Sequence, residues 1–226
     1  VEGAVNQLYT NLSLWLNQVD DHALFGIAGD FRRLNEIIEE VVLIIGTDEI
    51  ETIKSQIIAF EQLEFKNIGE NTFTAHNENN LLIRLFVVRK EDFYLNYFKQ
   101  TGNEKHVEEI LKLAGNGPFK NEEEIYSKAG LDFILPELRE GLNEIELAQQ
   151  HQLPNLINLT DLKGSLHNHS DWSDGVHTLE EMALYCKDEL KLEYLGICDH
   201  SKSAFYAKGL NEQRVYAQHQ QINELN

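Results

Sequence analysis

The fold is decided by Leu166-His167-Asn168-His169-Ser170-Asp171-Trp172-Ser173-Asp174-Gly175, which is followed after about thirty positions by Ile197-Cys198-Asp199-His200-Ser201. The pattern predicts a short apolar strand at 162–166, a helix at 178–190 and a second strand at 193–198. Both strands are apolar enough that we expect cover on both of their faces, as parallel sheets need. Because side chains alternate across a strand, the two histidines at the end of the first strand point to the same side. A right-handed βαβ unit then places His200 beside them, at the carboxyl ends of parallel strands.

Four side chains in this stretch are candidate metal ligands: His167, His169, Asp174 and His200. Neutral imidazole and carboxylate are the donors that Zn, Mn and Fe prefer in proteins. The alternative is that these are surface residues which lie near one another by chance, and a lone His-x-His would favour it. The full order of strand, His-x-His, Ser-Asp-Gly, helix, strand and Asp-His favours the metal site.

The same pattern resembles the opening of a PHP (polymerase and histidinol phosphatase) domain over roughly residues 160–226. The resemblance implies a distorted β/α barrel that hydrolyses phosphoesters with divalent metal ions, here Mn, Zn or Mg. It also implies further Glu, His and Asp-x-His ligands from later strands, which this sequence does not contain. We therefore expect the 226 residues alone to be inactive, with an open sheet edge that favours a homodimer.

Composition and charge restrict the class of protein. The sequence has 42% hydrophobic and 25% charged residues, as soluble globular proteins do. It has no apolar run near the ~20 residues that span a membrane. Its two cysteines, Cys186 and Cys198, are expected to be small buried hydrophobes without a disulfide. These features favour a cytoplasmic protein, and the lack of a starting methionine and of a capped end favours a piece of a longer one.

The net charge is −19, from 19 basic and 38 acidic residues. Residues 1–160 carry 13 basic and 27 acidic side chains, and residues 161–226 carry 6 and 11. Because nucleic-acid affinity comes largely from Lys and Arg contacts to phosphate, this balance does not favour tight sequence-independent DNA binding.

The first two thirds of the chain have an α+β pattern. Helices are predicted at 4–18, 50–59, 90–99 and 103–114, and strands at 23–28, 41–45, 62–68, 71–76 and 81–88. A turn at 69–71 joins two of the strands, and 141–160 forms a linker with a short helix. The order of helix, two strands, helix and a run of antiparallel strands is typical of α+β domains.

A second resemblance appears in this part. Gly29-Asp30-Phe31-Arg32-Arg33 before the strand at 41–45, Tyr97-Phe98 with Thr101-Gly102, and Leu135-Pro136-Glu137-Leu138-Arg139-Glu140 are similar to segments of the family X DNA polymerases. Bacterial members carry a PHP domain after the thumb, in the order seen here. The resemblance implies a nucleotidyltransferase-like palm at 1–115, a thumb end and linker at 116–160 and the start of a PHP domain at 161–226.

This sequence departs from the family at the polymerase carboxylates. Aligned on Gly29, the three positions fall at Glu40, Val42 and Arg84. Two-metal catalysis needs anionic oxygen ligands, and here one position is apolar and one carries a positive charge. We therefore expect the polymerase site to be lost, with Glu40 a remnant.

Gly29, Arg32 and Arg33 are candidates for weak nucleotide binding. The alternative is that the arginines pair with Glu36, Glu39 and Glu40.

Three functions are open for the protein. The first is a phosphoesterase or 3'-5' exonuclease that acts on DNA or nucleotides. The second is an active DNA repair polymerase, which is the family default. The third is a non-catalytic scaffold that positions DNA. None of the three implies a membrane partner.

Overall fold

The computed structural model describes residues 2–226, which divide by their contacts into unit 1, up to Pro154, and unit 2, from Asn155. The helices of unit 1 are α1 (Glu2–Val19), α2 (Gly29–Arg32), α3 (Ile50–Ile57), α4 (Phe93–Thr101), α5 (Glu104–Ala114), α6 (Glu122–Ala129) and α7 (Glu144–Gln149). Its strands are β1 (Leu24–Ala28), β2 (Glu40–Thr47), β3 (Glu64–Ile68), β4 (Thr72–His76) and β5 (Leu82–Arg89). The one-turn helices η1 (Lys90–Asp92) and η2 (Pro136–Leu138) complete it. The elements predicted between residues 4 and 114 are confirmed, with boundaries within three residues.

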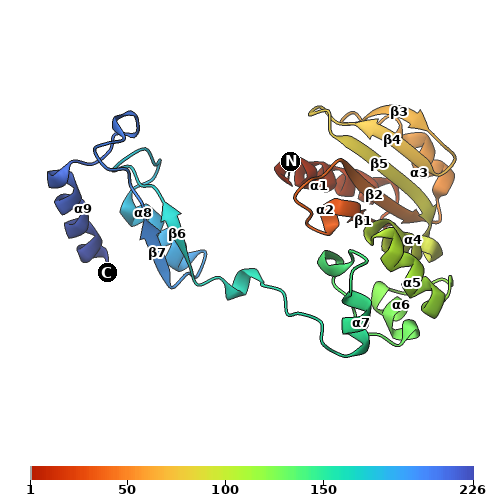
Figure 1. Ribbon diagram of the computed structural model, residues 1–226. Helices are drawn as coiled ribbons and strands as arrows, with labels where there is room; N and C mark the ends of the chain where they lie inside the picture. The colour runs from red at the N-terminus through yellow and green to blue at the C-terminus, as the bar shows by residue number, and fades with distance from the viewer. Residues whose placement is uncertain (1) are drawn as a thin grey trace. The chain divides into compact units, whose positions relative to one another are not determined.

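The five strands form one mixed sheet in the order β1-β2-β5-β4-β3 (Figure 1). Only β2 and β5 are parallel neighbours, and the other pairs are antiparallel. The arrangement is compatible with the α+β class.

Both faces of strand β2 are covered by helices. Val41, Leu43 and Ile45 belong to a core with residues of α1 and α3, whereas Val42 and Ile44 lie in a separate cluster with residues of α4. Alternation along the strand explains this division, because neighbouring side chains point to opposite faces. It also decides which residues share the surface on which the polymerase carboxylates were expected.

The helices α4 to α7 enclose a second apolar core with a polar centre. His106 of α5 is fully buried, and its Nδ1 lies 2.7 Å from Glu144 Oε1 while its Nε2 lies 2.9 Å from the Tyr126 hydroxyl. A carboxylate only accepts hydrogen bonds, so Nδ1 donates to Glu144 and Nε2 accepts from Tyr126. The three side chains connect α5, α6 and α7.

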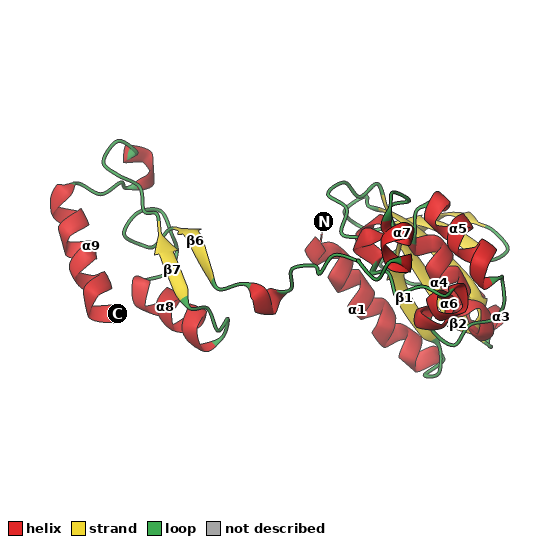
Figure 2. Cartoon of the chain, turned by 60° about the horizontal axis from the view of Figure 1, so that its bottom comes forward, coloured by secondary structure: helices red, strands yellow, loops and turns green. Residues whose placement is uncertain are grey.

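Unit 2 contains η3 (Leu159–Asp161), β6 (Gly164–Asn168), α8 (Leu179–Asp188), β7 (Tyr194–Ile197), η4 (Phe205–Ala207) and α9 (Glu212–Leu225). Strands β6 and β7 are parallel with α8 between them in sequence, as predicted. Strand β6 starts two residues later than expected, because Leu162 caps η3. Between α7 and β6, η3 is the one helical turn in the described chain (Figure 2).

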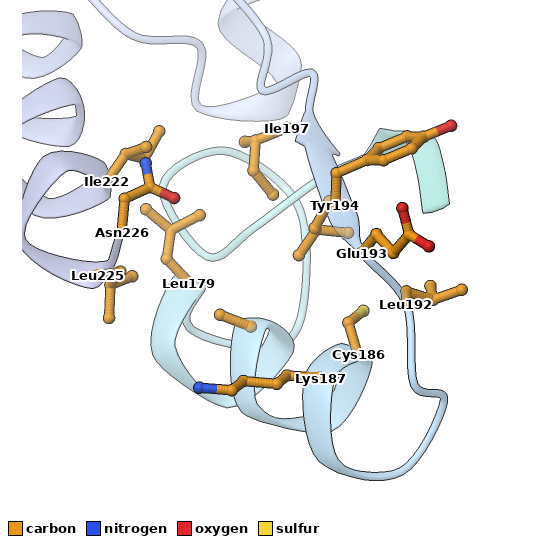
Figure 3. Close-up of a pocket in the computed structure, with 12 residues that line it drawn as sticks. Leu179, Cys186, Lys187, Leu192, Glu193, Tyr194, Ile197, Ile222, Leu225 and Asn226 are labelled. Carbon is orange, nitrogen blue, oxygen red and sulfur yellow. The ribbon is translucent and has the colours of Figure 1, made fainter. Parts of the chain in front are cut away.

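The expectation that both faces of β6 and β7 are covered was wrong. Leu166 is 69% exposed and Tyr194 is 49% exposed, because unit 2 provides only two strands. An apolar pocket of about 360 Å³ lies among α8, β7 and α9, and its lining includes Leu179, Ile197 and Ile222 (Figure 3).

Two further expectations concern the cysteines and the membrane. Both thiols are free, as predicted, but Cys198 is exposed and Cys186 is half-buried, so the prediction that they are buried was wrong. The thiol of Cys198 lies just after the carboxyl end of β7, 3.1 Å from the Leu166 carbonyl oxygen.

Among residues 2–226, no helix combines the length and the apolar character that crossing a membrane requires.

Candidate metal centre

The carboxyl ends of β6 and β7 meet at one edge of the two-stranded sheet. Asn168, the last residue of β6, donates from its side chain to the Gly196 carbonyl oxygen at 3.0 Å, and its own carbonyl oxygen accepts from the Cys198 amide at 2.7 Å. These bonds bring together the residues that follow the two strands. His169 and His200 are consequently neighbours, with ring centroids 4.6 Å apart.

Asp174 completes a cluster of three potential ligands. Its Oδ1 lies 3.3 Å from His169 Nδ1 and its Oδ2 lies 3.5 Å from His200 Nε2. One ligand atom from each residue lies within 4.8 Å of the other two. His169 Nδ1 is buried and has no hydrogen-bond partner. A buried polar atom without a partner is costly, and a metal ion would satisfy this one.

The fourth predicted ligand, His167, is not part of this cluster. It lies within β6, is exposed, and its ring centroid is 5.2 Å from that of His169. The two rings are close, as their spacing on a strand predicts, but the sequence predicted four ligands together and the structure brings three together. His177 and His219, both exposed, also lie outside the cluster.

The loop that carries Asp174 is held by Asp199, whose importance the sequence did not reveal. Asp199 accepts hydrogen bonds from the Ser170 amide at 2.8 Å, from the hydroxyls of Ser170 and Ser173, and from the Gln218 side chain. Burial acts to raise the pKa of Asp199, but these hydrogen bonds outweigh it and hold that pKa below its ordinary value. The sequence signal that could have identified Asp199 is its place in the Asp-His pair at the end of β7.

The same loop requires a glycine at position 175. The Gly175 amide donates to the Ser170 carbonyl oxygen at 2.9 Å, and a Cβ there would lie 2.0 Å from the His169 carbonyl oxygen. No side chain fits in that space, so Gly175 fixes the approach of Asp174 to His169.

In unit 1, the expected polymerase carboxylate positions share one face of the sheet. Val42 pairs with Arg84 in the parallel register of β2 and β5, and Arg84 Nη2 lies 2.8 Å from Glu40 Oε2. Val42 is 4% exposed and fills the space beside Gly29, where a Cβ on the glycine would meet it at 3.0 Å. The surface therefore presents an ion pair beside an apolar contact.

Arg32 and Arg33 are both engaged, but not with the acids that the sequence suggested. Arg32 pairs with Glu122 of α6 and donates to the Thr101 hydroxyl at 2.9 Å. Arg33 donates to Glu140 at 2.8 Å and also pairs with Asp30. The expected partners were close in sequence, whereas Glu122 and Glu140 are brought near by the fold.

Glu122 also pairs with Arg139, which is completely buried. Burial acts to raise the pKa of Glu122, but the hydrogen bond from Arg32 and the charge of Arg139 hold it below its ordinary value. One carboxylate therefore binds two arginines inside unit 1.

Comparison with known proteins supports the resemblances noted in the sequence. No protein-family model matches the chain. The chain is similar to a Bacillus subtilis (strain 168) protein named DNA polymerase/3'-5' exonuclease PolX, with 30% identity over 234 aligned positions. The alignment covers 93% of this chain and 40% of that relative, so the chain spans less than half of the relative's length. The match over nearly the whole chain, with both motifs in the expected order, fits a fragment of a PolX protein.

Proposed function

We propose that residues 161–226 are the first part of a PHP domain, a metal-dependent phosphoesterase that acts as a 3'-5' exonuclease on DNA or nucleotides. The observation that carries the proposal is the cluster of His169, Asp174 and His200, in which a buried ring nitrogen without a partner faces a carboxylate. The name of the Bacillus relative includes 3'-5' exonuclease activity, which supports the class of substrate.

The three donors fit a divalent ion such as Mn²⁺, Zn²⁺ or Mg²⁺. Bound there, such an ion would supply Lewis acidity toward a phosphate oxygen and would lower the pKa of water. Ring nitrogens of His169 and His200 and the carboxylate of Asp174 would hold it, while Asp199 keeps the loop of Asp174 in place. Three protein ligands leave room for a substrate, which is the pattern of catalytic sites.

The test uses protein expressed from the whole reading frame. His169→Ala is expected to lose bound Mn²⁺ and to lower the rate of 3'-5' hydrolysis by at least about 100-fold. Loss of a residue that only hydrogen-bonds to a metal ligand already lowers metal affinity or activity by up to about 100-fold, and loss of a ligand should cost more. Metal content by mass spectrometry and release of nucleotides are measured on the same preparation. The matched control is His177→Ala, which removes an exposed histidine outside the cluster. Wild-type metal content and turnover in His169→Ala would disprove the proposal.

We further infer that the palm does not polymerise DNA. The observation is the Arg84–Glu40 ion pair beside buried Val42, at the positions where the family resemblance implies three carboxylates. The guanidinium of Arg84 lies 2.8 Å from Glu40 and neutralises the negative charge that a metal ion would need from this carboxylate. Arg32 and Arg33 are already paired with acids, which disfavours nucleotide binding by Gly29 and its neighbours.

A primer-extension assay tests this inference. The protein from the whole reading frame is expected to show no template-dependent incorporation in Mg²⁺ or Mn²⁺, while the same preparation shortens the primer from its 3' end. The exonuclease signal is the internal control for intact protein. Robust extension would favour the alternative, an active DNA repair polymerase.

A non-catalytic role for the palm is the second candidate. Strand β2 is buried on both faces, so the sheet has a packed core although two of the expected carboxylate positions are not acidic. Such a domain would position DNA for the phosphoesterase site. Deleting it is then expected to weaken DNA binding without abolishing hydrolysis of a small phosphodiester.

The homodimer expected from the open edge of β6 and β7 also stays a prediction, which sedimentation equilibrium checks.

A further inference from the structure

Two large aromatic side chains stand exposed beside the candidate metal centre. Phe205 is 86% exposed and Tyr206 is 78% exposed, on the one-turn helix η4. The alanines on either side, Ala204 and Ala207, are buried. The turn is therefore anchored by its small residues and presents its rings to solvent.

The backbone of the loop that carries the two rings is fixed relative to His200. The Leu210 amide donates to the His200 carbonyl oxygen at 2.7 Å, and the Ala204 amide donates to the Ser201 carbonyl oxygen at 2.9 Å. A Cβ on Gly209 would lie 1.8 Å from the Ser201 carbonyl oxygen, so the loop closes tightly on itself. A closed loop that begins at a candidate ligand residue keeps the backbone of η4 close to the metal centre.

The two rings are nearly perpendicular, so a flat ligand that stacks on Tyr206 would meet the Phe205 ring beside it. The Tyr206 centroid lies 6.2 Å from that of His200, and the Phe205 and Tyr206 centroids lie 5.9 Å apart with an interplanar angle of 79°. Lys208, two residues after Tyr206, is exposed and has a left-handed backbone with φ 54°, and no ion pair engages it among residues 2–226. An aromatic face with an adjacent free cation is what single-stranded nucleic acids bind.

We propose that Phe205 and Tyr206 form a stacking platform for the base of the nucleotide whose phosphate lies at the metal centre. A nucleotide carries its base a few bonds from its phosphate, so a phosphate held by the cluster places the base within reach of Tyr206. The inference rests on the proposed function and makes it more specific. The preferred substrate is a strand end with an intact, unpaired base, in preference to a base-free phosphate ester.

Binding is measured without catalysis. The probe is a short single-stranded DNA with 2-aminopurine at its 3' end, whose fluorescence falls when the base stacks, and with a hydrolysis-resistant phosphorothioate as its last linkage, titrated in Mn²⁺. Tyr206→Ala is expected to weaken binding about 5- to 100-fold, the range that loss of one base–aromatic stack produces. A strand with an abasic 3' end should bind wild type and variant equally.

Three variants separate stacking from other effects. Tyr206→Phe keeps the flat ring and is expected to bind as wild type does, whereas Tyr206→Leu keeps apolar bulk and is expected to behave like Tyr206→Ala. Tyr185→Ala is the matched control, because it removes an aromatic side chain of unit 2 that is 59% exposed and lies on α8. Equal affinities of wild type, Tyr206→Ala and Tyr206→Leu for the 2-aminopurine strand would overturn the proposal.

Hydrolysis in Mn²⁺ of the same two strands, made with an ordinary phosphodiester as the last linkage, distinguishes the failure of this inference from that of the proposed function. If protein from the whole reading frame hydrolyses neither strand, the phosphoesterase proposal fails. If it hydrolyses both with the same KM, and Tyr206→Ala does not change that KM, the phosphoesterase stands and the stacking platform is rejected. The expected result is a higher KM for the abasic strand, which Tyr206→Ala reproduces on the intact strand.

Discussion

Glu122 is a single carboxylate on which one buried arginine, Arg139, and one half-buried arginine, Arg32, depend. Changing it to Gln removes the negative charge that Arg32 and Arg139 share while preserving the size of the side chain. Breaking a buried ion pair typically costs about 3–5 kcal/mol, because the remaining charges lack compensation. We expect Glu122→Gln to lower the free energy of unfolding of unit 1 by that amount, measured by urea denaturation.

The control lies next to it on α6. Glu123 is exposed, so Glu123→Gln is expected to change the free energy of unfolding by less than about 0.5 kcal/mol. If the two variants are equally stable, the buried network contributes nothing to the stability of unit 1.

Individual residues also show the limits of sequence reasoning. His169, Asp174 and His200 were found because their spacing on strands is a local property. The partners of Arg32 and Arg33 were missed because Glu122 and Glu140 lie about a hundred positions away in the sequence. Nothing in the order of residues distinguishes such acids from the many others in a chain with 38 of them.

At the scale of elements, α5, α6 and α7 are connected through a titratable group. Burial lowers the pKa of His106 below its ordinary value of 6.5 and outweighs the hydrogen bond to Glu144. The folded state therefore binds fewer protons than the unfolded chain below pH 6.5. Stability is complete above that pH and falls as the pH decreases toward the folded pKa.

The pH dependence of this contact is a specific prediction. Unfolding of unit 1, followed by circular dichroism in urea, is expected to become easier as the pH falls from 7 to 5. His106→Gln should flatten the dependence in that window, whatever its effect at pH 7. His22→Gln, at an exposed histidine of unit 1, should leave the dependence unchanged. An identical pH profile for wild type and His106→Gln would contradict the assignment.

Element boundaries were predictable where a cap decides them. Thr178 starts α8 in a capping box with Glu181, and Asn211 accepts from the Arg214 amide at the start of α9, both within a few residues. The start of β6 was misplaced because η3 uses Leu162. The prediction that both faces of β6 and β7 are buried was wrong, because burial of a sheet face depends on other elements, which an apolar strand pattern does not reveal.

For the whole molecule, the segment between α7 and β6 is the accessible one. Most side chains from Asn155 to Lys163 are exposed, and the segment contains only the turn η3 among helices and strands of the described chain. Limited digestion with proteinase K is therefore expected to cut here first, because exposed backbone without regular structure is the preferred substrate. Mass spectrometry should identify a fragment ending near Pro154. First cleavage inside α4–α6 would contradict the division into two units.

The ion pair between Arg84 and Glu40 has an evolutionary consequence. Any route from the present residues to three carboxylates on that face needs changes at both position 42 and position 84. Val42→Asp alone buries a charge against Gly29, and Arg84→Asp alone sets two like charges side by side. Each change adds a negative charge without a partner to this face, so each single step towards three carboxylates is expected to lower the stability of unit 1 unless a cation binds at the same time.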